Sequence, residues 1–254
     1  MTRPATDVQL VANLLDQGHR QREIADMTGV PQPTLARWMS GDIGAAIASR
    51  RALADHDATA CSLVDNAPPS EYAYLLGLYL GDGCISTHRR GVFRLQIYCC
   101  DSYPGLMTLC HDTMQRVLPA SKVGRVGRDG CTEVYSFSKH WPCLFPQHGP
   151  GMKHLRPIVL TDWQGQILEA HADQVLRGLI HSDGCRVANR VVTRGRAYEY
   201  PRYFFVNQST DIIGICTRCL DLLGIEWRMN RPNSVSIARR ASVAALDRFI
   251  GPKT

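Results

Sequence analysis

The sequence predicts an α+β protein in which a small all-α segment precedes a larger body made of two similar repeats. Three observations support this class. The stretch YLLGLYLGDGCIS at Tyr74–Ser86 is matched, 101 positions later, by VLRGLIHSDGCRV at Val175–Val187. The same order of strand-like and helix-like patterns follows each stretch. Residues 7 to 40 show the apolar spacing of short helices, with no alternating strand pattern.

Composition allows a soluble protein that binds nucleic acid. The 254 residues can form one or two domains, and 44% hydrophobic with 20% charged residues is typical of soluble globular proteins. The net charge of +6 is compatible with a DNA or RNA partner. No signal-peptide pattern is visible at the N-terminus, and no apolar run approaches the roughly 18 residues of a membrane span. We therefore expect no membrane partner, reduced thiols, and a cytoplasmic location, associated with a bacterial nucleoid.

Two groups of cysteine and histidine have spacings that could bind zinc. The first is CTRC, with Cys216 and Cys219, which lies in an amphipathic pattern that favours buried structural cysteines. The second is HWPCLFPQHG, which offers His140, Cys143 and His148. The sequence leaves zinc binding at either group open.

Residues 1–42 are predicted to form a helical DNA-binding domain. In QREIADMTGVPQPTLARWMSG, Gly29 suits the positive φ of a tight corner between two helices, and Leu35 and Trp38 suit anchors to a small core. The stretch resembles the helix-turn-helix domains of bacterial regulators and recombinases. That resemblance implies groove-facing positions for Gln32, Thr34 and Arg37. The alternative is a helical hairpin with no nucleic acid partner.

Residues 43–70 are predicted to be a linker, because they are rich in alanine and small polar residues and end in Pro68-Pro69. One helix is expected near Ala45 to Ala54. The body then occupies residues 71–254, with repeat one at 71–160 and repeat two at 161–254.

Each repeat is predicted to run helix, two strands, helix, two strands, helix. In GVFRLQIYC, apolar and polar residues alternate, as in a strand with one buried face. The next helices are SYPGLMTLCHDTMQRVL in repeat one and STDIIGICTRCLDLLG in repeat two, with Ser102 and Ser209 as expected caps. The second hairpins are expected to turn at Asp129-Gly130 and at Pro232-Asn233.

These two motifs and their trailing elements resemble the LAGLIDADG homing endonuclease family, over residues from about 70 to the end of the chain. The resemblance implies two motif helices packed side by side at a pseudo-twofold axis, so that one chain acts as a pseudo-dimeric monomer. Two four-stranded sheets would then form a saddle along the major groove of double-stranded DNA. The small residues that would let the helices approach are Gly77, Gly81, Gly178 and Ser182.

In that family the motif aspartates meet beneath the DNA, which would bring Asp82 and Asp183 together. Two carboxylates about 5 Å apart repel by roughly 3 kcal/mol at an effective dielectric near 20, so the resemblance implies a divalent cation, with Mg²⁺ suited to oxygen ligands. The alternative is that both aspartates only cap the ends of helices. Lys153 and Lys253, each 16 residues after the equivalent positions Phe137 and Ile237, resemble the family's basic residue near the site. A solvated tail lysine is the alternative for Lys253.

Arginines are predicted to supply most DNA contacts, although genome base composition alone could explain their excess over lysine. Most are expected to touch phosphates and a few to read base edges. The candidates on the strands are Arg94, Gln96, Arg125, Arg128, Arg190, Arg194, Arg228 and Arg231.

Three functions fit these patterns. The first is a site-specific, metal-dependent DNA endonuclease, which both aspartates favour. The second is a catalytically silent DNA-binding transcriptional regulator with the same fold. The third is an RNA-binding splicing helper.

Overall fold

The protein is described by a computed structural model, which covers residues 5–40, 61, 64, 66–149, 151–193, 195–251 and 253. Contacts divide the chain into an N-terminal unit, which contains the first three helices, and a larger unit, which contains both repeats. Most of the predicted linker, including the helix expected near Ala45 to Ala54, lies outside the described residues.

Residues 5–40 of the N-terminal unit form three helices, α1 (Ala5–Asp16), α2 (Gln21–Thr28) and α3 (Gln32–Ser40). Gly29 ends α2 in the left-handed conformation, with φ at 63°, and its N–H donates to the carbonyl of Ala25. This is the tight corner that the sequence predicts. A small core holds the helices together, and its buried side chains are Val11, Leu14, Ile24, Val30, Leu35 and Trp38.

The larger unit repeats one order of elements twice. Repeat one consists of α6 (Pro69–Asp82), β1 (Gly83–Thr87), β2 (Phe93–Cys100), α7 (Pro104–Val117), β3 (Val123–Arg128), β4 (Cys131–Ser138) and α8 (Trp141–Leu144). Repeat two consists of α10 (Ala172–Asp183), β5 (Gly184–Thr193), β6 (Arg196–Val206), α11 (Thr210–Leu222), β7 (Arg228–Arg231), β8 (Ser234–Ile237) and α12 (Arg240–Asp247). The 3₁₀ turn η3 (Lys153–Leu155) and helix α9 (Asp162–Ala170) also belong to this unit, and the 3₁₀ turn η2 (Arg89–Gly91) connects β1 to β2.

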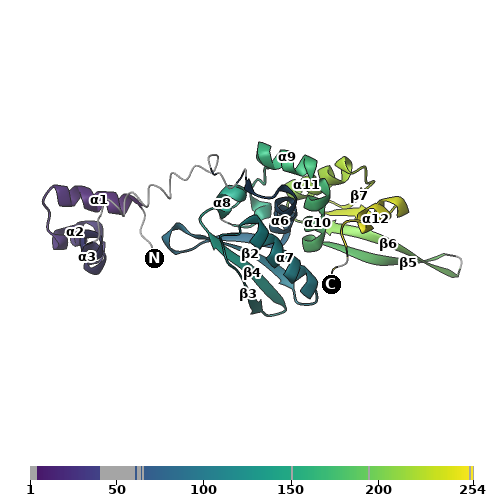
Figure 1. The fold of residues 1–254 in the computed structure, drawn as a ribbon, viewed down its shortest axis with the longest axis horizontal. Coiled ribbons are helices and arrows are strands. Elements are labelled where there is room, and N and C mark those ends of the chain that lie inside the picture. Colours follow the sequence, from purple (N-terminus) through teal and green to yellow (C-terminus); the bar gives the residue numbers. More distant parts are fainter. Residues whose placement is uncertain are drawn as a thin grey trace. The chain divides into compact units, whose positions relative to one another are not determined.

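The two sheets have the same topology, β1-β2-β4-β3 in repeat one and β5-β6-β8-β7 in repeat two. Figure 1 shows α6 and α10 between the two sheets of this unit. The predicted α+β class and the two-repeat organisation are therefore confirmed. A single buried cluster contains side chains from both repeats, including Leu76 of α6, Leu179 of α10 and Phe205 of β6.

Alternation along the strands gives each sheet one covered and one open face. On β2, Leu95 and Ile97 are buried in the core, whereas Tyr98 is exposed. Directly paired residues share a face, so Tyr98 lies on the same face as Glu133 of β4. We call the face that carries Tyr98 and Glu133 the open face of sheet one.

Helix α9 and the length of the β5–β6 hairpin were not predicted from the sequence.

The two predicted serine caps have different outcomes. Ser209 caps α11 as expected, accepting a hydrogen bond from the Ile212 N–H at 3.4 Å. Ser102 does not cap α7, so that prediction was wrong: the helix starts at Pro104 with Tyr103 as its N-cap residue. Proline favours the first helical position because its φ is preset and it has no N–H to satisfy.

No described helix is long and apolar enough to cross a membrane.

Candidate active site

Helices α6 and α10 cross at two glycines that touch. A Cβ on Gly77 would lie 2.3 Å from the carbonyl oxygen of Val175 and 2.8 Å from the Cα of Gly178. A Cβ on Gly178 would meet the carbonyl oxygen of Tyr74 at 2.3 Å. Real Cβ atoms do not approach backbone this closely, so only glycine allows this crossing.

One turn further along, the crossing is less symmetric. Gly81 of α6 faces Ser182 of α10, whose hydroxyl would lie 2.0 Å from a Cβ on Gly81. The Ser182 hydroxyl donates to carbonyls of its own helix, those of Gly178 and Leu179. The four small residues predicted from the sequence all lie at this crossing, and the next residue of each helix is an aspartate.

Asp82 and Asp183 are the last residues of α6 and α10, so the crossing places both carboxyl groups at one end of the helix pair. Burial and the nearby charge of Asp183 raise the pKa of Asp82 to about 6, although Lys153 and Lys253 oppose this. Burial also raises the pKa of Asp183, while a hydrogen bond from Asn207 acts in the opposite direction. Ionising both carboxyl groups is therefore unfavourable in the protein alone.

Asn207 is a site residue that the sequence analysis missed. Its side-chain amide donates to the Asp183 carboxylate at 2.7 Å, and its own oxygen accepts from the Ser209 backbone N–H. Asn207 directly follows β6, and its counterpart Asp101 directly follows β2. A polar residue at the end of the same strand in both repeats was the signal that could have identified this position.

The two predicted lysines lie near the aspartates but bind backbone. Lys153 on η3 donates to the carbonyls of Tyr79 at 2.5 Å, Leu80 at 2.8 Å and Gly81 at 2.7 Å. Lys253 donates to Ser182 and Gly184, at 3.3 and 2.5 Å. A cation at a helix C-terminus offsets the partial negative charge of the unpaired carbonyls. Burial lowers the pKa of Lys153 to about 8 despite both aspartates.

The carboxyl groups have the properties of ligands for a divalent cation. Both aspartates are only partly exposed, and neither forms an ion pair within the described residues. Asp82 has no hydrogen-bond partner there either. Two neighbouring, underpartnered carboxylates that raise each other's energy suit a hard cation such as Mg²⁺, which prefers oxygen ligands. Asp82 and Asp183 would hold it.

The predicted DNA-binding residues of sheet one fall on both faces. Arg94 and Arg128 lie on the open face, but both pair with Glu133, whose side chain is fully buried. Arg94 also lies over the ring of Tyr135, 4.3 Å from its centroid. Arg125 pairs across the sheet with buried Val134, and its guanidinium reaches the Thr108 hydroxyl of α7 on the covered face.

Gln96 lies on the open face and is buried there. Its amide donates to Cys84 and Ser86 of β1, at 3.4 and 3.1 Å.

In sheet two, the register places Arg228 and Arg231 opposite Ser236 and Ser234, on the open face. In the described part of the chain neither arginine forms an ion pair, and both are exposed. Arg190 shares a face with Arg186, whose guanidinium pairs with Asp247 of α12 on the covered side.

Three remaining DNA-binding predictions lie in less described or separate regions. Arg194 and the side chain of Arg37 lie outside the described residues. At the start of α3, Gln32 is exposed and Thr34 is half-buried. DNA contact by all of these residues stays a prediction.

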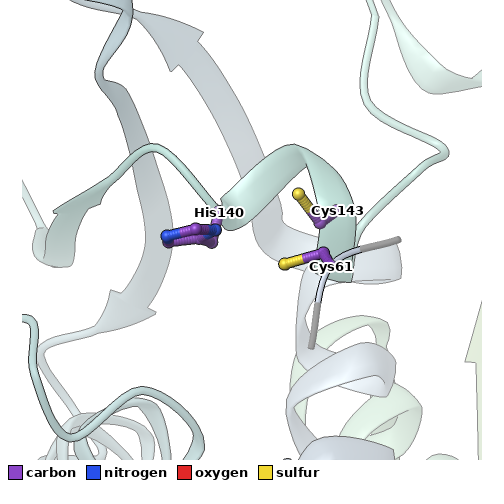
Figure 2. A group of neighbouring side chains, drawn as sticks. All are labelled: Cys61, His140 and Cys143. Carbon is purple, nitrogen blue, oxygen red and sulfur yellow. The ribbon is translucent and has the colours of Figure 1, made fainter. Parts of the chain in front are cut away.

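Neither cysteine and histidine group shows a complete zinc site. Cys216 and Cys219 are fully buried in α11, and burial raises the pKa of both thiols. Figure 2 shows His140 and Cys143 at α8, with ligand atoms within 4.8 Å of each other. The third side chain drawn there, Cys61, belongs to the N-terminal unit. His148 instead packs against the ring of Phe93.

Comparison with known proteins gives structural matches only. No protein-family model and no curated protein matches the chain. The solved structures that it resembles include LAGLIDADG proteins. The homing endonuclease I-DmoI, in complex with DNA and Mn, is 17% identical and covers 73% of this chain and 99% of its own, with a TM-score of 0.47.

Two further similar structures have the same family name. The N-terminal LAGLIDADG domain of WhiA is 14% identical, covers 75% of this chain and 88% of its own, and has a TM-score of 0.43. The LAGLIDADG meganuclease I-AabMI, bound to uncleaved DNA, is 11% identical, covers 70% and 82%, and has a TM-score of 0.44.

Proposed function

We propose that the protein binds a specific site in double-stranded DNA and hydrolyses a phosphodiester in each strand, with Asp82 and Asp183 as the residues that hold a divalent cation. The observation that carries this proposal is the pairing of the two carboxyl groups at the α6–α10 crossing. If the two aspartates only capped helix ends, the glycine contacts that bring the two helix ends together would not be needed.

In this reaction a water oxygen adds to phosphorus, one bridging P–O bond breaks, and a proton ends on the leaving oxygen. A bound Mg²⁺ would make the water more acidic and stabilise the leaving oxygen. The chain's own residues position that chemistry. Asn207 fixes the Asp183 carboxylate, and the two lysines hold the ends of both helices and place positive charge near the aspartates.

The open faces would supply affinity and register. Arg228 and Arg231 are exposed and form no ion pair with the acidic side chains that the structure describes, so they suit phosphate contacts. The N-terminal unit would add a second reading element in the same chain, which raises local concentration at the target.

A second candidate is a DNA-binding regulator that does not cut. The specific observation in its favour is Lys153, whose three ammonium protons are all directed at backbone carbonyls. A lysine held in this way caps a helix and is not free to approach a phosphate. Under this candidate the aspartates would affect stability only.

The deciding experiment first selects targets by incubating the protein with a supercoiled plasmid library and Mg²⁺ and sequencing any new ends, and in parallel by binding selection. Footprinting and cleavage are then measured on one target, with Mg²⁺ or with chelator. We expect Asp82→Asn and Asp183→Asn to lose cleavage while keeping the footprint. A parent protein that protects its own selected target but yields no metal-dependent ends would instead support the regulator.

A further inference from the structure

Two hollows flank the α6–α10 crossing, and each pairs the aspartate of one repeat with the lysine that follows the other repeat. One has a volume of about 280 Å³ and contains Asp183 with Lys153. The other has a volume of about 70 Å³ and contains Asp82 with Lys253. We call them the Asp183 hollow and the Asp82 hollow. Pseudo-symmetry relates their charged residues, whereas their volumes differ fourfold.

The larger hollow also has the more polar lining. Beside its aspartate and lysine, the Asp183 hollow is lined by the polar residues Asn207, Gln208 and His154. The Asp82 hollow is lined largely by apolar side chains, among them Leu78, Ile97 and Leu106. A hydrated cation and a phosphate both need room and hydrogen-bonding partners, so the Asp183 hollow admits them more readily.

The aspartates also differ in how firmly they are held. Asn207 donates to the Asp183 carboxylate at 2.7 Å, and it is fixed in turn by the Ser209 N–H. Its counterpart Asp101 is a carboxylate with no amide to donate, and it accepts a hydrogen bond from the Thr132 hydroxyl of β4 at 2.8 Å. One carboxylate is therefore oriented by a neighbouring amide, and the other has no such partner in the described residues.

We propose that the two halves of the site act in a fixed order, with the strand that enters the Asp183 hollow cut first and Asn207 as the positioning residue that sets this order. This inference rests on the proposed function. Each cut adds one water across one phosphodiester, as described above. The product of the first half of the reaction is a nicked duplex, which remains bound until the Asp82 hollow completes the second cut.

The test uses a target duplex with a different fluorophore on each strand, under single-turnover conditions with Mg²⁺. For the parent we expect one strand to be cut about 10-fold faster, so that a duplex nicked in that strand accumulates. Asn207→Ala should slow this first cut by about 10-fold or more. The rate of the other strand, measured on a duplex already nicked in the first, should stay unchanged.

Asp101→Asn is the matched control, since Asp101 occupies the same position in repeat one and accepts its hydrogen bond from Thr132. It should leave both rates unchanged. Thermal unfolding of both variants shows whether the fold is intact. Because loss of a purely structural residue would slow both strands alike, the strand selectivity of Asn207→Ala reports positioning.

A second readout does not depend on cleavage. Calorimetric titration of Mn²⁺ into the complex with a duplex that carries non-hydrolysable linkages at both cut positions should show about 10-fold weaker binding for Asn207→Ala than for Asp101→Asn. Equal cutting rates in the two strands, or a defect of Asn207→Ala in the second strand, would overturn the order while leaving the nuclease intact. Absence of any metal-dependent cut in either strand would overturn the proposed function itself, and this inference with it.

Discussion

At the α6–α10 crossing the two repeats are alike. A Cβ on Gly77 or on Gly178 would in each case lie 2.3 Å from a carbonyl oxygen of the partner helix. On the open faces the repeats differ, because sheet one ties Arg94 and Arg128 to the buried Glu133, whereas Arg228 and Arg231 of sheet two are exposed. The two repeats are therefore symmetric where backbone packs against backbone, at the helix crossing, and they differ where side chains face outward from the sheets.

The largest expected effect tests the symmetric part. Gly77→Ala and Gly178→Ala should each lower the free energy of unfolding by more than the roughly 1 to 3 kcal/mol of ordinary overpacking, because the new methyl meets backbone that cannot rotate away. Urea unfolding measures both. The control is Gly214→Ala in α11, where a Cβ would meet nothing within 4 Å and should stabilise the helix by about 1 kcal/mol. Unequal losses at the two glycines would show that the crossing is not symmetric.

The next effect concerns the aspartates and depends on pH. The pKa of Asp82 in the folded protein, about 6, lies above its usual 3.8. The folded state therefore binds a proton more tightly than the unfolded state, and stability falls as pH rises from about 4 to 6. The asparagine in Asp82→Asn cannot ionise. In chelator, the free energy of unfolding of this variant should therefore exceed that of the parent by an amount that grows across this pH window, to at most about 3 kcal/mol.

Urea unfolding at several pH values measures this difference. Asp183→Asn should raise the free energy of unfolding by less than Asp82→Asn does, because it also removes the carboxylate that accepts a hydrogen bond from Asn207. A gain that shrinks as pH rises would contradict the assignment.

The third comparison is between arginines of the two open faces. Arg94→Ala should lower stability by about 2 kcal/mol, less than the 3 to 5 typical of an abandoned buried charge, because Arg128 still pairs with Glu133. Arg228→Ala should change stability by less than about 0.5 kcal/mol but weaken DNA binding by roughly 1 to 3 kcal/mol. Thermal unfolding and a binding titration at fixed salt measure the two quantities. The reverse pattern would mean that sheet one, and not sheet two, offers the free arginines.

The smallest expected effect is the difference between the serines near the starts of α7 and α11. Ser209→Ala should cost about 1 kcal/mol, because the Ile212 N–H loses its acceptor, whereas Ser102→Ala should cost almost nothing. Urea midpoints measure the difference. Equal losses would show that Ser102 has a role that its position before Tyr103 does not explain.

Much of the fold could be predicted because its elements have clear patterns. The family resemblance carried by the repeated motif implied the pairing of α6 and α10, and Gly29 and Asp129-Gly130 indicated two changes of chain direction. Ser102 could not be assigned correctly from spacing alone, since the nearby Pro104 decides where the helix begins. Helix α9 was missed because no repeat partner supported it.

The candidate site was predictable in part for a similar reason. Asp82 and Asp183 lie inside the repeated motif, so symmetry identified them. Asn207 lies outside the repeated motif, and its counterpart Asp101 is a different residue type with a different partner, so the shared polar character at the end of the strand was its only signal. The face of each arginine depends on strand register. Arg125 reaches α7 because it pairs with Val134, which a count of basic residues does not reveal.

The buried cluster that contains Leu76, Leu179 and Phe205 belongs to neither repeat alone. A polypeptide that ends between the repeats would expose the apolar, glycine-bearing side of α6 to water. Two separately produced halves would each find their missing core in the other. We therefore expect two halves that are divided between η3 and α9 to associate with each other through the shared core.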